Sequence, residues 1–285
     1  HDKGHSDNHQ LFRDFRALLD SYQPERFSVG EIHIADWDEW ASYYGDELDE
    51  LHQPFNFSLV HSPWDVEEIA SRVGAQESAI PAGAWPNYVL GNHDEKRITE
   101  RIGTAAARTA AMLLLTLRGT PTLYYGDEIA MTEADIAPED QQDPWGRNLP
   151  GAGRDGCRTP MQWDGSSHAG FAPAGTESTW LPVTSDYAQL NVAEQLSDAT
   201  SILSLYRALL AYRKGSAALQ TGDYRRVDAP AGVYAYNRGN SVLVALNMTG
   251  EPIDVSFAGV IALSTHGEGA ETTRLRPNEG LIIEV

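Results

Sequence analysis

Two carboxylates in this sequence each follow a short apolar run, at positions where they would share one active site. Glu31 comes after the run at 27–29, and Asp94 comes after the run at 88–90. Because parallel strands end at the same edge of a sheet, two such side chains would meet there. Paired carboxylates are typical of glycoside hydrolysis, in which one acts as acid and base while another stabilises an oxocarbenium-like transition state. Glu31 taken alone is more often a helix-capping or solvated carboxylate, so this prediction rests on the pair.

Metal-assisted hydrolysis is the rival chemistry, since it also uses histidine and aspartate. His33, His93 and His168 are scattered, however, and no two histidines have the spacing of a zinc-binding helix. The single cysteine, Cys157, has no second thiol at metal-ligand spacing and allows no internal disulfide, so we interpret it as an inert core residue. The sequence therefore predicts no metal site and no cofactor.

Helical and strand-like segments alternate through the first 130 residues and form the scaffold for these carboxylates. Helical spacing of apolar residues predicts helices at 11–22, at 37–44, from about 65 onward and at 105–117. Short apolar runs predict four strands, at 27–29, 55–60, 88–90 and 122–125. Strands separated by helices indicate parallel βα units with right-handed connections. Such units place the active site of a βα barrel or an open α/β sheet just after the strands.

The pattern changes twice in the second half of the chain. Residues 132–182 are rich in glycine, proline, aspartate and aromatic residues without periodicity, and their tryptophan and arginine clusters favour an ordered loop. An amphipathic helix at 202–214 comes next, followed by strand patterns at 222–227, 233–238, 241–247, 253–257 and 281–285, with a tight hairpin at 239–240. We therefore predict an α/β region over 1–214 and an all-β domain over 215–285.

The charge of the chain limits its partners. It has 41 acidic residues against 21 lysines and arginines, a formal net charge of −20 at pH 7, which repels nucleic acid and anionic membrane surfaces. No apolar run reaches the roughly 20 residues needed to span a bilayer, and residues 1–30 contain no targeting pattern. The lone cysteine favours a cytoplasmic location. His1 in place of Met indicates a processed product or a fragment.

Four segments resemble signatures of the α-amylase superfamily of (β/α)8-barrel glycosidases. Residues 27–31 are similar to its strand-five signature, 89–94 (Val-Leu-Gly-Asn-His-Asp) to its strand-seven signature, and 118–128 to its strand-eight segment. Residues 154–163 (Arg-Asp-Gly-Cys-Arg-Thr-Pro-Met-Gln-Trp) resemble a loop of its α-glucosidase branch, which includes oligosaccharide α-glucosidases, sucrose isomerases and trehalose synthases. The resemblance implies the C-terminal half of a TIM barrel, strands five to eight, followed by a small antiparallel β-sandwich domain.

The same resemblance implies roles for the residues after the strands. Glu31 would be the general acid/base and Asp94 the transition-state stabiliser, while His93 and Asn92 would contact the sugar. To donate a proton near neutral pH, Glu31 should have its pKa raised by burial and by a neighbouring carboxylate, whereas Asp94 should stay ionised.

Further positions carry two interpretations each. Arg97 matches an arginine that lies beside the bound sugar in the α-glucosidase branch, or it is a solvated arginine at a helix start. Arg154 and Asp155 border the leaving-group subsite, or they form a structural salt bridge. Trp145 and Trp163 stack on sugars or pack in the loop, and buried packing is the favoured interpretation.

One part of the family pattern is missing. The family's nucleophile is an Asp in an Arg-x-Asp motif at the end of strand four, and the only strand-like match, at 226–228, lies in the predicted β domain. The early-barrel segment ending in Asn-His and the calcium-binding loop are missing too. The resemblance therefore implies a half barrel with two open sheet edges, unstable alone or associated with the missing N-terminal half.

These observations combine into one hypothesis with two alternatives. We expect an α-glucosidase-type hydrolase that acts on short α-linked glucosides by a retaining mechanism, with this chain inactive alone because the nucleophile is absent. A glycosyl-transferring relative, such as a sucrose isomerase or trehalose synthase, shares the same carboxylates. A non-catalytic binding or scaffold homologue is the third reading, against which the presence of Glu31 and Asp94 argues.

Overall fold

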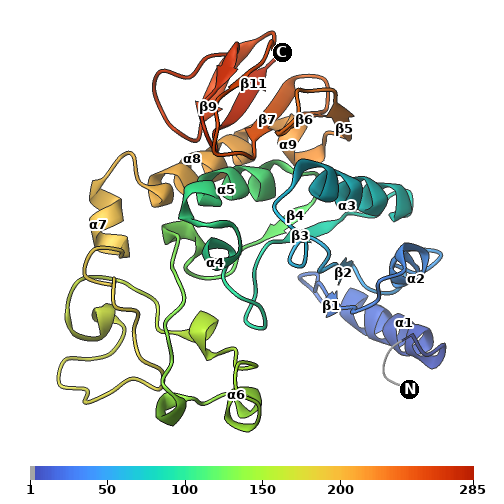
Figure 1. The fold of residues 1–285 in the computed structure, drawn as a ribbon. Helices are drawn as coiled ribbons and strands as arrows, with labels where there is room; N and C mark the ends of the chain where they lie inside the picture. Colours follow the sequence, from blue (N-terminus) through green and yellow to red (C-terminus); the bar gives the residue numbers. More distant parts are fainter. Residues whose placement is uncertain (1–3) are drawn as a thin grey trace.

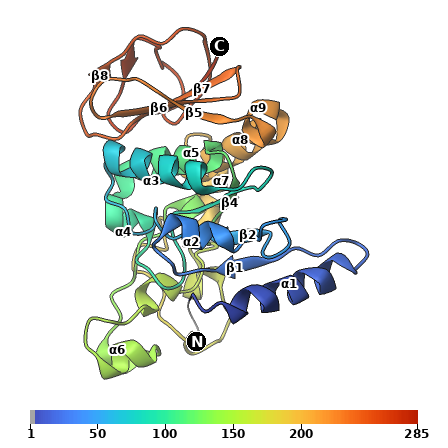
Figure 2. The same cartoon turned by 90° about the vertical axis from the view of Figure 1, so that its right-hand side faces the viewer.

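A computed structural model describes residues 4–285, so the first three residues of the predicted α/β region lie outside the described range. Helices and strands alternate up to residue 122: α1 Asp7–Asp20, β1 Val29–Glu31, α2 Trp37–Ser42, β2 Gln53–Phe55, α3 Val66–Ala79, β3 Asn87–Val89, α4 Ile98–Ile102, α5 Ala107–Thr116 and β4 Thr120–Thr122. A C-terminal sheet lies over a layer of helices that includes α3, α5 and α8 (Ile202–Gly215) (Figure 1). The parallel strands lie on the other side of these helices, as Figure 2 also shows.

The four predicted strands are present as two parallel pairs. β1 pairs with β2, and β3 pairs with β4. β2 contacts β3, and the Nε2 of Gln53 donates a 2.7 Å hydrogen bond to the Oγ1 of Thr120, which links the two pairs. The strands at 55–60 and 122–125 were predicted too late in the chain. Pro54 and Pro121 lie inside β2 and β4, and proline is a poor signal for a strand because it has no N–H to donate.

The apolar residues that suggested a longer second strand are buried for another reason. Phe57, Leu59 and Val60 lie in the turn after β2 and pack into the interior. At these three positions, apolar character therefore indicates burial in the interior and not pairing within a strand. The following helix, α3, is capped by Asp65, whose carboxylate accepts hydrogen bonds from the backbone N–H groups of Glu67 and Glu68.

The C-terminal region is one antiparallel sheet with a short ribbon. Its strand order is β5-β6-β7-β11-β9, and the ribbon pairs β8 with β10. The bounds are α9 Ala217–Thr221, β5 Tyr224–Val227, β6 Val233–Arg238, β7 Val242–Asn247, β8 Ile253–Asp254, β9 Val260–Ser264, β10 Arg274–Leu275 and β11 Gly280–Glu284. The predicted hairpin joins β6 to β7, with Gly239 at a φ of +55°. The predicted antiparallel β domain is therefore present, as a five-stranded sheet with a two-stranded ribbon.

Two strand predictions in this region were wrong in detail. β9 was not predicted, because Val-Ile-Ala-Leu-Ser has no polar and apolar alternation. The strand predicted at 253–257 is only two residues long, and Val255 and Phe257 continue through backbone bonds to Thr273 and Thr272.

The sheet and the helical layer share one hydrophobic core. Leu113 of α5 and Leu209 of α8 belong to the same buried cluster as Tyr234, Tyr236 and Ile282 of the sheet. Alternate residues of β6, such as Ala235, face the opposite side and join a second, smaller core under the ribbon. The regions predicted as 1–214 and 215–285 are therefore packed together through the sheet face that α5 and α8 cover.

The outer edges of the parallel strands have no partner strand in the described part of the chain. β1 pairs only with β2, and β4 only with β3. No residue of α1 is fully buried. Large apolar side chains are exposed next to β1, and we call these residues the open face: Leu11, Phe15, Leu18, Phe27 and Val29. Leu123 and Tyr125 are exposed after β4. These are the features expected of a half barrel.

The segment between β4 and α8 is ordered mainly by short helical turns. It contains α6 Pro144–Asn148 and α7 Val192–Ser197, and α6 lies at the end of the molecule farthest from the C-terminal sheet in both views (Figures 1 and 2). No helix within residues 4–285 is long and apolar enough to cross a membrane.

Candidate active site

Parallel pairing places the polar residues after β1 and β3 at the C-terminal ends of the strands. Glu31 is the last residue of β1, and its side chain is 51% exposed. The Nε2 of His33 lies 3.7 Å from its Oε2, and the His33 ring stacks on Phe57 at 4.4 Å between centroids. The burial that we expected around Glu31 is therefore wrong for this structure. The acid/base role of Glu31 stays a prediction.

The loop after β3 is shaped by Asn92. Its Oδ1 accepts hydrogen bonds from the backbone N–H groups of Asp94, at 2.9 Å, and Glu95, at 3.0 Å. This local turn fixes the backbone that carries Asp94. Asn92 thus has a structural use for its side-chain oxygen, and its contact with a sugar stays a prediction, as does that of the exposed His93.

Two arginines from the long segment converge on Asp94. The Nη1 of Arg154 and the Nη2 of Arg158 donate to its Oδ1 at 2.7 and 2.9 Å. The Nε of Arg158 also donates to the backbone oxygen of His93 at 2.7 Å, so Arg158 holds both the side chain and the preceding peptide. Two positive charges at hydrogen-bond distance complement a carboxylate. Arg158 was not predicted as a site residue, although it lies inside the loop motif at 154–163.

Arg154 also binds a second, buried carboxylate. Its Nε and Nη2 donate to the two oxygens of Asp143 at 2.8 and 2.9 Å, a bidentate pair. The Arg154 guanidinium holds the pKa of Asp143 well below its usual range. Asp155 is not the salt-bridge partner of Arg154: its Oδ2 accepts from the backbone N–H groups of Gln142 and Asp143 at 2.6 and 2.9 Å. Asp155 therefore fixes the loop that presents Asp143.

Arg97 is buried, which excludes the solvated helix-start interpretation. Its guanidinium lies over the rings of Tyr124 and Tyr125, 5.2 and 4.9 Å from their centroids. Its Nη1 donates a 2.7 Å hydrogen bond to the backbone carbonyl oxygen of Tyr125. Its backbone N–H donates to the Oε1 of Glu133. Arg97 braces the loop after β4 against the loop after β3, and its contact with a sugar stays a prediction.

The favoured interpretation of the two loop tryptophans was wrong. Trp145 and Trp163 are 61% and 50% exposed rather than buried. The Trp145 ring lies under the Arg154 guanidinium at 4.5 Å, so an exposed aromatic face stands next to the group that holds Asp94. Cys157, by contrast, is buried as predicted, and burial raises the pKa of its thiol to about 11.

Asp127, which sequence reasoning did not single out, gives the site a pH-dependent stability. It is buried close to Gly91 and Arg97, and burial raises its pKa to about 7. Below about pH 4 this carboxyl is protonated in both the folded and the unfolded state, so the stability that depends on its protonation is fully present there. As the pH rises towards 7 the unfolded chain releases the proton first, and stability falls by up to about 4 kcal/mol.

Asp127→Asn should flatten this dependence, because asparagine does not ionise. Between pH 4.5 and pH 8, urea unfolding of the unsubstituted chain should lose about 3 kcal/mol more than the variant. Asp135→Asn, at an exposed neighbouring position, serves as the control and should keep the original slope. Equal slopes for the unsubstituted chain and Asp127→Asn would contradict the prediction.

Nothing in the described residues points to a bound metal. Across residues 4–285, no three His, Cys, Asp or Glu side chains are arranged to hold an ion. Two carboxylates follow β1 and β3: Glu31 is exposed, and Asp94 is held by arginines, one of which, Arg154, lies over the Trp145 ring. Such a set is suited to acid–base chemistry on a neutral substrate.

Comparison with known proteins shows the family. Residues 2–222 match the family model described as alpha amylase, catalytic domain. A probable alpha-glucosidase of Rhizobium meliloti is 33% identical over 264 residues, which covers 88% of this chain and 47% of the relative. The amino acid transporter heavy chain SLC3A1 of Rattus norvegicus is 32% identical, covering 97% of this chain and 43% of the relative. The chain thus spans about half the length of these curated relatives.

Solved structures agree with this assignment. The trehalulose synthase MutB from Pseudomonas mesoacidophila MX-45 superposes with a TM-score of 0.87 at 26% identity, covering 98% of this chain and 59% of that one. The antiparallel sheet at the C-terminus is included in this coverage. The chain therefore belongs to the alpha-amylase catalytic-domain family, with the TIM-barrel fold of that family and an antiparallel sheet at its C-terminus.

Proposed function

We propose that this chain supplies half of the active site of a retaining α-glucosidase that acts on short α-linked glucosides. In this proposal β1 to β4 are strands five to eight of the barrel. One observation carries it: Glu31 and Asp94 stand at the C-terminal ends of β1 and β3, and Arg154 and Arg158 hold Asp94. The α-glucosidase relatives support the substrate class.

The proposed chemistry divides between the two carboxylates. Protonated Glu31 donates its proton to the glycosidic oxygen as the bond to the sugar breaks, and the resulting carboxylate later takes a proton from the attacking water. Asp94 stabilises the positive charge that develops on the sugar ring. The nucleophile must lie about 5–5.5 Å from the acid. We place it on a preceding segment, at the end of a strand that pairs with the open edge of β1 and covers the open face.

The complete barrel, meaning this chain together with the segment that carries the nucleophile, is the form to assay against the chain alone. On p-nitrophenyl α-glucoside and maltose, we expect the 285-residue chain to release no glucose and the complete barrel to turn over with retention of the α-anomer. The loss reflects the missing glycosyl-enzyme intermediate and should amount to several orders of magnitude. Hydrolysis by the chain alone, at rates near those of intact relatives, would refute the claim that the nucleophile is absent from this chain.

A glycosyl-transferring enzyme is the second candidate, and the similarity to a trehalulose synthase favours it specifically. Product analysis with sucrose separates the two. Glucose and fructose in equal amounts indicate hydrolysis, whereas an isomeric disaccharide indicates transfer. The similarity to an amino acid transporter heavy chain supports the non-catalytic reading. A complete barrel that leaves every one of these glucosides unchanged would favour that reading.

A further inference from the structure

The loop that carries Asp94 is held at both ends by a single arginine of α4. The Nε of Arg101 donates a 3.2 Å hydrogen bond to the backbone oxygen of Lys96, and its Nη2 donates to the backbone oxygen of Leu90. These two oxygens flank residues 91–95, the stretch in which Asp94 lies. One guanidinium therefore fixes where this stretch begins and where it ends, through hydrogen bonds strengthened by its positive charge.

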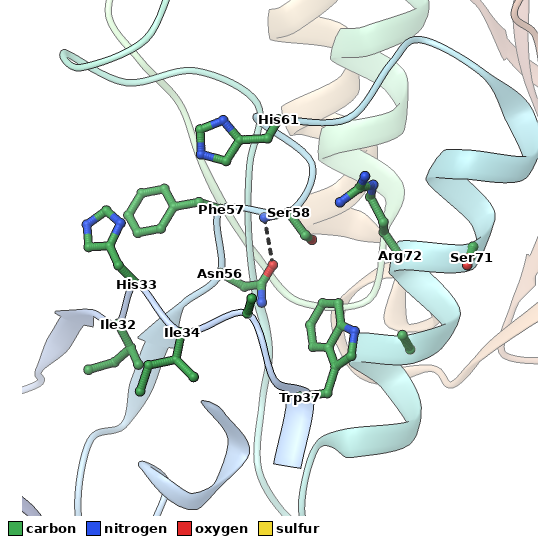
Figure 3. Close-up of a pocket in the computed structure, with 12 residues that line it drawn as sticks. Ile32, His33, Ile34, Trp37, Asn56, Phe57, Ser58, His61, Ser71 and Arg72 are labelled. Carbon is green, nitrogen blue, oxygen red and sulfur yellow. Dashed lines mark hydrogen bonds between the residues drawn. The ribbon is translucent and has the colours of Figure 1, made fainter. Parts of the chain in front are cut away.

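The third nitrogen of Arg101 reaches the turn after β2. Its Nη1 donates to the backbone oxygen of Val60. Earlier in this turn, the ring of Phe57 stacks on that of His33 at 4.4 Å between centroids, beside Glu31 (Figure 3). Arg101 thus ties the loop after β3 to a segment that packs next to the other carboxylate of the site. We call this guanidinium and its three oxygens the Arg101 clamp.

The surroundings of Arg101 keep the clamp charged and its acceptors dependent on it. Burial lowers the pKa of its guanidinium, but the nearby carboxylates of Asp127 and Glu95 oppose that shift, so the group stays protonated at neutral pH. Leu90 and Val60 are buried, so water is a poor substitute partner for their backbone oxygens. Loss of the guanidinium should therefore loosen the loop rather than leave it in place.

We propose that Arg101 is a positioning residue for Asp94. It sets where the Asp94 carboxylate lies relative to Glu31, and this role rests on the proposed function. Arg154 and Arg158 contact the carboxylate itself, whereas Arg101 fixes the backbone that carries it. Because Asp94 acts on charge that develops in the transition state, its misplacement should lower kcat and leave KM little changed.

Arg213 of α8 offers a matched control, since it makes the same kind of contact away from the site. Its Nη1 donates to the backbone oxygens of Leu115 and Leu117 at 2.8 and 3.3 Å, and its Nη2 donates to that of Gly119. These oxygens precede β4, whereas the candidate active site follows the strands. Burial lowers the pKa of this guanidinium too. Arg101→Met and Arg213→Met should therefore destabilise the fold to a similar extent.

Kinetic constants of the complete barrel on maltose test the proposal. In Arg101→Met we expect kcat to fall by roughly tenfold to a hundredfold, with KM within about threefold of its original value. Arg101→Lys keeps the charge but not the planar set of donors, so it should recover part of the loss. Arg213→Met should keep kcat, and thermal unfolding followed by circular dichroism shows that the variants are folded. Equal falls of kcat in Arg101→Met and Arg213→Met, or an unchanged kcat in Arg101→Met, would overturn the proposal.

Hydrogen–deuterium exchange in the complete barrel separates this inference from the proposed function, because it does not depend on turnover. The backbone N–H groups of Asp94 and Glu95 hydrogen-bond to Asn92 within the clamped stretch. Arg101→Met should speed their exchange by about tenfold or more, and Arg213→Met should leave it unchanged. A barrel that releases no glucose but shows this difference would refute the proposed function and support the clamp. Unchanged exchange in Arg101→Met would overturn the clamp, whatever the activity.

Discussion

Glu31→Gln in the complete barrel is expected to lower turnover of maltose by about 10²–10⁴-fold, because glutamine keeps the shape of the side chain but has no proton to donate to the glycosidic oxygen. The position of Glu31 as the last residue of β1 makes this substitution structurally mild, since its side chain is half exposed and its backbone is held by the pairing with β2. The effect should therefore be on chemistry rather than on folding.

The dependence on the leaving group distinguishes an acid from a residue that only positions the substrate. A dinitrophenyl α-glucoside expels a weakly basic phenolate that needs little protonation, so bond cleavage should be much less impaired for it than for maltose. Kinetic constants for both substrates provide the measurement. Glu25→Gln, at an exposed position in the segment before β1, is the control and should keep normal turnover. Equal losses for the two substrates would show that Glu31 is not the acid.

Arg154→Ala is expected to damage both stability and turnover, because one guanidinium serves two carboxylates. Asp143 is buried and loses its bidentate partner, which should lower the free energy of unfolding by about 3 kcal/mol. Asp94 loses one of its two arginine contacts and with it part of its fixed orientation. Turnover of the complete barrel should fall accordingly, whereas Arg154→Lys should keep the charge and recover only part of both losses.

Urea unfolding of the chain and kinetic constants of the complete barrel measure the two losses separately. The pKa of Asp143 is held low by Arg154, so the pair stabilises the fold above about pH 4, and that contribution is lost as the pH falls through the folded-state pKa. The stability loss in Arg154→Ala should therefore shrink in acid. Arg147→Ala, which removes only bonds to neutral oxygens of the same segment, is the control. Indistinguishable unfolding of the two variants would contradict a role for the Asp143 pair.

The reliable predictions from the sequence rest on burial patterns and on the periodicity of apolar residues. Glu31 and Asp94 were placed at or after strand ends because an apolar run followed by polar residues marks the end of a strand. The amphipathic helix α8 and the β6–β7 hairpin were predicted correctly for the same reason. These features depend on residues a few positions apart, and local spacing encodes them.

Prediction of strands from apolar patterns failed where a strand contains proline or has no alternating pattern. Pro54 and Pro121 lie within β2 and β4, where the sheet tolerates a missing N–H that sequence rules count against a strand. β9 went unnoticed because its pattern does not alternate. In each case the pairing partner, rather than the segment itself, supplies the stabilisation that makes the strand.

By itself, the sequence determined the alternation of helices and strands, the carboxylates that follow the strands, the family resemblance and the buried state of Cys157. Only the tertiary structure decided that Arg154 and Arg158 reach Asp94 from 60 and 64 residues away, that Trp145 is exposed beside them, and that Asp155 supports a loop rather than an ion pair. Local periodicity reports which face of an element is buried. Which charges meet is set by the long-range packing of a loop that has no periodicity to reveal its path.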